Sequence, residues 1–231
     1  MIHTPAGVQP VPGPEYLRPT RFFDWEAPII RELTARTIDG AATETERAVK
    51  LFYAVRDGWR YDPFTMTLEP NDYVASVVAT HSAAYCIPKA ILLVAAARAA
   101  GVHAGIGLSD VVNHMTTEKL KARMGGKTYF MHHGYAVLYL GGRWVKAAPA
   151  FNIELCERFH VRPTEFDGTC DAVFQEFDAL DRRHMEYVKD HGVWSEFPFE
   201  RVAADFRAFY PIDTFADDDP GERFEDGRPV T

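Results

Sequence analysis

One apolar segment constrains the fold of this chain more than any other feature of its sequence. The run PKAILLVAAARAA, from Pro88 to Ala100, is rich in alanine and leucine and nearly apolar around the whole circumference of a helix. A helix without a polar face has to be surrounded by protein, and Gly101 directly after it is a typical residue for a helix C-terminus. We therefore expect a central, buried helix over residues 88–100, with Cys86 at or just before its first turn.

The remaining pattern predicts helices on the N-terminal side of this segment and strands on its C-terminal side. Apolar residues recur at helical spacing over 26–37 and 43–57, and the second run opens with a possible capping box of Thr43 and Glu46. Strands are expected over 102–108, 134–140 and 143–148, with a two-glycine hairpin at 141–142 and a short helix near 117–124. The sequence thus indicates an α+β fold in which the buried helix packs on an antiparallel sheet.

Length and composition favour one domain. The chain has 231 residues, of which 47% are hydrophobic and 25% charged, so it can bury a sizeable core. We expect a single domain over 1–231, with a proline-rich extended arm at 1–19 and an acidic, loosely held tail at 213–231. The three cysteines are an odd and sparse set, which favours reduced thiols over a disulfide framework.

Charge and hydropathy argue against several classes of function. The net charge is −8 and no run rich in Lys or Arg appears, so nucleic acid and anionic membrane surfaces are not expected partners. No apolar run reaches the roughly 20 residues of a membrane-spanning helix, and the start lacks the pattern of a secretion signal. We expect a cytoplasmic protein. No CxxC pair occurs, and His132 and His133 lack the i, i+4 spacing of a helical metal pair, so neither metal nor cofactor is expected.

Cys86 is the candidate nucleophile. The free amides and the dipole at a helix N-terminus stabilise an anion, and such an environment can lower the pKa of a cysteine. The alternative is that Cys86 is a small buried hydrophobic residue, as most free cysteines are. His133 opens the strand over 134–140 and supplies a possible base, whereas His132 would face the other side of a regular strand.

The stretches AAYCIPKAILLVAAARAAGVHAGIGL and HGYAVLYLGGRWVKAAP, within residues 75–152, resemble the core of the transglutaminase-like superfamily. The resemblance implies a papain-like, transglutaminase-core fold with a Cys-His-Asp site, in which Cys86 is the nucleophile and His133 the general base. Ala148 stands where the family has its aspartate. Asn152 is the best substitute, because an amide oxygen can orient an imidazole. Asp167 is a more remote candidate, and the imidazole could also have no side-chain partner.

Further polar residues are candidate substrate contacts. Asn113 and His114 follow the first predicted strand, at an end of the sheet where a pocket could form, although His114 can equally be an ordinary loop histidine. Lys146 shares a strand face with Ala148 and could bind an anionic group, but a solvated lysine is the simpler interpretation. The set of predicted substrate-binding residues is Tyr85, Asn113, His114, Tyr135 and Lys146.

These features lead to a cysteine-dependent hydrolase or acyl transferase that acts on a small-molecule or peptide carbonyl through a thioester intermediate. Two alternatives stay open. One is a peptidase or isopeptidase of the same fold, and the other is a non-catalytic binding protein that has lost the aspartate of the triad, for which Ala148 is the main evidence.

Overall fold

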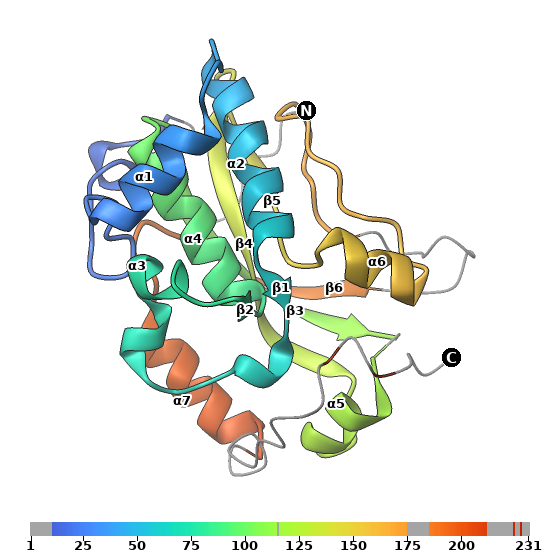
Figure 1. Ribbon diagram of the computed structural model, residues 1–231. Coiled ribbons are helices and arrows are strands. Elements are labelled where there is room, and N and C mark those ends of the chain that lie inside the picture. Colours follow the sequence, from blue (N-terminus) through green and yellow to red (C-terminus); the bar gives the residue numbers. More distant parts are fainter. Residues whose placement is uncertain (1–10, 115, 175–184, 212–223, 225–226, 228–231) are drawn as a thin grey trace.

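The computed structural model describes residues 11–114, 116–174, 185–211, 224 and 227, and it has a mixed α+β architecture (Figure 1). The helical N-terminal part contains the short 3-10 turns η1 (Pro14–Tyr16), η2 (Pro63–Thr65) and η3 (Pro70–Tyr73) and the helices α1 (Pro28–Thr37), α2 (Glu44–Gly58), α3 (Ala75–Val78) and α4 (Cys86–Ala99). A small parallel pair, β1 (Arg60–Tyr61) and β2 (Ala83–Ala84), leads into α4.

The C-terminal part forms a four-stranded antiparallel sheet. Its order is β5-β4-β3-β6, built from β3 (Ala104–Asn113), β4 (Tyr129–Leu140), β5 (Arg143–Ala147) and β6 (Met185–Trp194). Three helices accompany these strands: α5 (Glu118–Arg123), α6 (Ile153–Phe159) and α7 (Phe199–Phe209). The expected α+β fold with a helix packed on an antiparallel sheet is confirmed.

Helix α4 is the centre of the molecule. Every residue from Cys86 to Arg98 is buried, and the helix is packed between α1, α2 and α3 on one side and β4 on the other (Figure 1). Its apolar circumference predicts this burial, because all of its faces meet protein. The first residue of α4 is Cys86, so the thiol stands at the end of a helix that the whole core fixes in place.

Local sequence signals explain where several elements begin and end. Helix α2 starts with the predicted capping box, in which the Thr43 side chain accepts from the Glu46 amide and the Glu46 carboxylate accepts from the Thr43 amide. The hairpin between β4 and β5 turns at Gly141 and Gly142, whose φ angles of 57° and 81° disfavour any residue with a side chain.

The sheet is longer than predicted, and the elements after residue 152, namely α6, β6 and α7, were not predicted. Strands β3 and β4 both extend past the predicted ranges of 102–108 and 134–140, on the side that forms the site. Strand β6 was missed because much of it is polar and exposed, as in an edge strand. Helix α7 lies in an aromatic-rich stretch that gave no clear periodicity.

The two ends of the chain are described in part. Within the expected arm at 1–19, residues 1–10 lie outside the described range, and Tyr16 is buried against Trp144 with ring centroids 5.0 Å apart. Within the expected tail at 213–231, only residues 224 and 227 are described, and Phe224 packs against the rings of Tyr61, Phe64 and Phe159. None of the described helices has the length and hydropathy needed to cross a lipid bilayer.

Candidate active site

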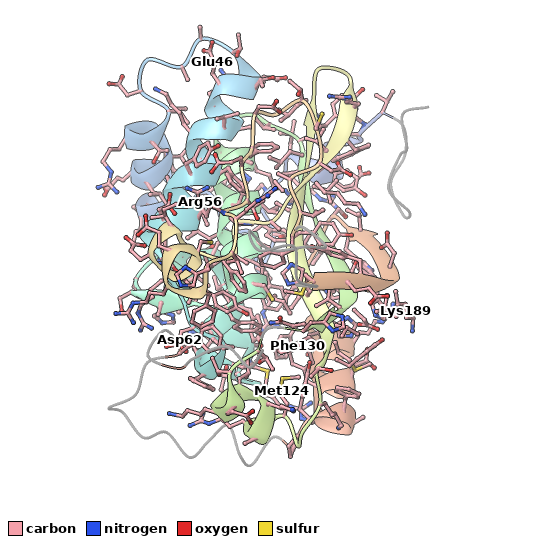
Figure 2. The ribbon with its side chains drawn as sticks, turned by 90° about the vertical axis from the view of Figure 1, so that its right-hand side faces the viewer. Glu46, Arg56, Asp62, Met124, Phe130 and Lys189 are labelled. Carbon is pink, nitrogen blue, oxygen red and sulfur yellow. The ribbon has the colours of Figure 1, made fainter. Side chains whose placement is uncertain are left out.

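An apolar cavity of about 60 Å³ lies where the N-terminus of α4 meets the ends of β3, β4 and β6. Figure 2 shows Met124 and Phe130, two of its lining residues, in the lower half of the molecule beside α5. The lining residues are Tyr61, Pro63, Met66, Tyr85, Cys86, Val111, Asn113, Leu120, Met124, Phe130, Met131, His132, His133, Phe151, Phe174, Met185, Phe206 and Tyr210. Cys86 and His133 therefore share one enclosed site.

The sulfur of Cys86 is buried and largely neutral. Burial raises the pKa of its thiol to about 11, because a thiolate loses hydration there. Backbone hydrogen bonds from Gly134 and Ile87 lower the pKa but do not outweigh the burial. The expectation that the helix terminus would lower the pKa of this cysteine is therefore wrong for the ligand-free protein.

Gly134 brings strand β4 into direct contact with the start of α4. A Cβ atom at this position would lie 2.9 Å from the Cα atom of Ile87, closer than real Cβ atoms approach another backbone. Only glycine lets the strand and the helix meet so closely. Because His133 precedes Gly134 and Cys86 precedes Ile87, this contact is what places the thiol and the imidazole at the same cavity.

His133 is buried and held by aromatic packing. Its ring centroid lies 5.0 Å from that of Phe174 and 6.0 Å from that of Tyr187. Burial lowers the pKa of the imidazole to about 3, and among the described residues Nε2 has no hydrogen-bond partner. None of the hydrogen bonds described in the chain joins this ring to the sulfur of Cys86. The resting pair is thus a neutral thiol and a neutral imidazole.

The structure does not place either predicted substitute for the triad aspartate on His133. The Oδ1 atom of Asn152 accepts from the Tyr61 amide at 2.9 Å, and its Nδ2 atom donates to Glu154 at 2.7 Å. Asn152 therefore ties the start of α6 to β1, which corrects its predicted role. The carboxylate of Asp167 accepts from Thr169 within its own turn.

The position of the family's aspartate is apolar in this chain. Ala148 is buried in a small cluster with Tyr16, Tyr135 and Trp144. Its side chain can accept no hydrogen bond. Among the described residues, the aromatic packing of Phe174 and Tyr187 and the backbone of β4 are what hold the His133 ring.

The predicted substrate-binding residues fall into two groups. Tyr85 and Asn113 line the cavity with Cys86 and His133. Tyr135 and Lys146 pack together elsewhere, with the Lys146 Nζ atom 5.1 Å from the Tyr135 ring centroid and 3.5 Å from Asp190. They belong to the side of the sheet opposite α4, so their predicted contact with the substrate is not supported.

His114 also lies away from the cavity. It is exposed, and its Nε2 atom is 3.6 Å from the carboxylate of Glu186 on the neighbouring strand. The simpler interpretation, a histidine at the protein surface, describes it better than a substrate contact.

Sequence reasoning missed a buried polar network next to His133. The Asp110 carboxylate accepts from the His191 ring at 2.7 Å, from the Tyr129 hydroxyl at 2.7 Å and from the His132 amide at 3.0 Å. Burial alone would raise the pKa of Asp110, but these hydrogen bonds outweigh it and lower the pKa. Since His132 has a positive φ of 55°, the network anchors an irregular piece of backbone directly before His133.

His132 is the second histidine of this network. Its Nε2 atom lies 2.7 Å from Asp205 of α7, and its buried Nδ1 atom has no partner among the described residues. One ligand atom each from Asp110, His132 and His191 lie within 4.8 Å of one another, a donor set that suits a transition metal. These residues come from three strands far apart in sequence, so no motif spacing could reveal them. In this structure the Asp110 carboxylate is already engaged by three donors.

Comparison with known proteins connects this site to one family. Residues 31–149, more than half of the chain, match the family model described as the transglutaminase-like superfamily. A solved structure from Cytophaga hutchinsonii, described as a candidate cysteine protease, is similar with a TM-score of 0.45 and 14% sequence identity. That match covers 77% of this chain and 53% of the other, so the chain spans about half the length of that protein. Among curated proteins, no sequence matches this chain.

Proposed function

The chain belongs to the transglutaminase-like superfamily, and on that basis we propose that it is a cysteine-dependent hydrolase or acyl transferase acting on a carbonyl substrate. The papain-like, transglutaminase-core fold class predicted from the sequence is confirmed at this level. In the proposed reaction Cys86 is the nucleophile and His133 is the base. The observation that carries the proposal is their meeting in one enclosed cavity, at the N-terminus of a helix that the core holds rigid.

The proposed chemistry starts from the neutral pair. As the sulfur attacks the carbonyl carbon, the Cys86 proton passes to the His133 imidazole and a C–S bond forms. In this scheme the amides at the start of α4 donate to the developing oxyanion. The imidazolium then returns its proton to the leaving group as the original acyl bond breaks, which leaves a thioester. Water or a second nucleophile attacks the thioester and restores the thiol.

Among the described residues no side chain takes the place of the triad aspartate, so other contacts have to orient His133. In a triad, the aspartate fixes the tautomer and the orientation of the histidine. Here Phe174 and Tyr187 restrict the ring by contact. Because a thiol is far more acidic than a serine hydroxyl, proton transfer to an imidazole without a carboxylate partner is less difficult for cysteine.

The non-catalytic alternative also has an observation in its favour. A buried thiol with a pKa of about 11, an imidazole with a pKa of about 3 and Ala148 in place of an aspartate describe a site that could retain the scaffold without turnover. Trapping the covalent intermediate separates these two functions, because a binding protein forms no acyl-enzyme.

The test is acylation of the intact protein by an activated ester. We expect p-nitrophenyl acetate to add one acyl group to Cys86, as shown by intact mass and peptide mapping, and Cys86→Ser to abolish this adduct at that position. Cys170→Ser is the matched control, because Cys170 is exposed and outside the cavity. Acylation of Cys170 alone, or none at all, would contradict the proposal. A parallel panel of peptide substrates tests the peptidase alternative.

A further inference from the structure

All four methionines of the described residues line the cavity that contains Cys86. Met66 precedes η3, Met124 follows α5, Met131 belongs to β4 and Met185 begins β6. Four separate segments thus contribute the same side chain to one small site. Methionine is unbranched and polarisable, and it adapts to ligands of varied shape. A wall of this composition can yield to a chain that enters the cavity.

The described wall of the cavity contains no acidic side chain, lysine or arginine. Two of the tyrosine hydroxyls at the wall are already engaged, since Tyr85 pairs with Tyr73 at 2.6 Å and Tyr210 accepts from the Met131 amide at 2.7 Å. A carboxylate or ammonium group placed here would lose its hydration without gaining an oppositely charged side chain from these residues.

The size of the cavity limits what it holds before it yields. At about 60 Å³ it is smaller than the roughly 150 Å³ engineered cavity that accommodates benzene. A short aliphatic chain fits such a space better than a flat ring, and longer chains require the methionines to move. The thiol and the imidazole are at the same wall, so the reacting carbonyl of a bound group would lie next to them.

We infer that this cavity is an acyl chamber, which binds the uncharged, aliphatic acyl group of the substrate while its carbonyl reacts with Cys86. This inference rests on the proposed function and adds the substrate class to it. The chamber favours acyl groups that bury apolar surface and disfavours those that carry a charge. Its flexible methionine side chains allow it to accept acyl groups of different chain length.

The experiment compares acylation of the full chain by p-nitrophenyl esters of acetate, butyrate, hexanoate and succinate. Each methylene that becomes buried should raise kcat/KM by roughly fourfold, the factor that corresponds to about 0.8 kcal/mol. The succinyl ester, which carries a carboxylate on a chain of similar length to butyrate, should react at least tenfold more slowly than the butyryl ester. Rates that are independent of chain length, or equal rates for butyryl and succinyl esters, would overturn the inference even if Cys86 is acylated.

Two variants test the role of the wall. Met124→Leu replaces a flexible side chain by a branched one of similar volume, so it should lower the ratio of the hexanoyl rate to the acetyl rate several-fold. The control is Val188→Leu, at an exposed position on β6 outside the cavity, which should leave the whole series unchanged. If Met124→Leu also leaves the series unchanged, the methionine wall does not bind the acyl chain.

A binding measurement keeps the inference testable if no ester reacts. In Cys86→Ala, hexanamide should raise the melting temperature in a concentration-dependent way, whereas 6-aminohexanamide, its cationic counterpart, should not. Stabilisation by hexanamide without acylation of the unmodified protein would retain the chamber and reject the catalytic proposal. Equal effects of the two amides, or no effect of either, would reject the chamber.

Discussion

At Cys86 two electrostatic effects oppose each other, and burial is the larger. The helix terminus and two backbone hydrogen bonds favour a thiolate, but removal from water raises the pKa to about 11. The same burial lowers the pKa of His133 to about 3. From sequence one can predict that a thiol stands at a helix start, but not how deeply the later strands and α7 cover it. The position of the thiol therefore follows from the sequence, whereas the sign of its pKa shift does not.

Alkylation measures this pKa directly. Because only the thiolate reacts, the rate of iodoacetamide labelling at Cys86 should rise about tenfold for each pH unit between 7 and 10. Peptide mapping by mass spectrometry separates its rate from that of Cys170, which is exposed and should be labelled first at neutral pH. A labelling rate at Cys86 that reaches its plateau near pH 7 would show instead that the thiolate is the resting form.

Asp110 is the residue on which the backbone before His133 depends. Asp110→Ala leaves the His191 ring, the Tyr129 hydroxyl and the His132 amide without their acceptor. Since removal of one partner from a buried charged network typically costs 3–5 kcal/mol, we expect a loss of about that size in the free energy of urea unfolding. Glu32→Ala, at an exposed position of α1, is the control. A loss below about 1 kcal/mol for Asp110→Ala would mean that the network does not hold this backbone.

At the level of elements, the contact between β4 and α4 is the feature that assembles the site. Gly134→Ala would place a Cβ atom against the backbone of Ile87, so the strand has to move away from the helix that carries Cys86. We expect a lower melting temperature and at least a tenfold slower acylation of Cys86. Gly58→Ala is the matched control, because a Cβ at Gly58 meets nothing within 4 Å. If Gly134→Ala folds and its acylation rate is unchanged, the close contact between β4 and α4 is not needed to assemble the site.

Lys89 joins α4 to the end of α2. Its Nζ atom donates to the carbonyls of Arg56 and Trp59 at 2.7 and 2.5 Å, and burial lowers its pKa to about 7. In Lys89→Met both carbonyls lose this donor, at a cost of about 1–3 kcal/mol for each unsatisfied group. Burial of the charged amine is itself unfavourable, so its removal offsets part of this cost. We therefore expect a net destabilisation of about 1–3 kcal/mol at pH 7, measured by urea unfolding.

The difference in stability between the unmodified protein and Lys89→Met should depend on pH in a definite direction. The pKa of Lys89 is lower in the folded state than in the unfolded state, so between these two values the unfolded chain binds more protons and stability rises with pH. The cost of burying the charged amine is complete below pH 7 and is relieved as pH rises. The gap in stability between the unmodified protein and Lys89→Met should therefore widen from pH 7 to 9. Lys50→Met, at an exposed position, should show no such trend.

Elements with a strong local signal were predicted, and those defined by their neighbours were not. The capping box of Thr43 and the apolar circumference of α4 are visible in the sequence because each depends on residues close together in the chain. Strand β6 exists because β3 offers it a hydrogen-bonding edge, which no local pattern records. Of the predicted site residues, Cys86, His133, Tyr85 and Asn113 line the cavity. The contacts among Asp110, His132 and His191 form only through the sheet, so no local pattern predicts them.

In the whole molecule, Arg98 connects segments that are far apart in sequence. Its guanidinium donates to the carbonyls of Arg18, Ala104 and Ser195 at 2.8–3.0 Å, and it lies over the ring of Phe23. A basic side chain near the end of a helix is commonly explained by its interaction with the helix dipole. The planar group instead ties the N-terminal segment and the segment after β6 to β3, which only a fork of several donors can do.

Arg98→Leu should therefore destabilise the molecule by at least about 3 kcal/mol, because three carbonyls that are buried or partly buried lose their donors. Arg98→Lys should recover only part of this loss, since a single ammonium cannot reach all three acceptors in the guanidinium geometry. Urea unfolding gives the free energies, and limited proteolysis should show earlier cleavage near residues 11–20 in both variants. Arg31→Leu, an exposed change on α1, controls for the loss of one positive charge. If Arg98→Lys is as stable as the unmodified protein, the charge of Arg98 and not its geometry joins these segments.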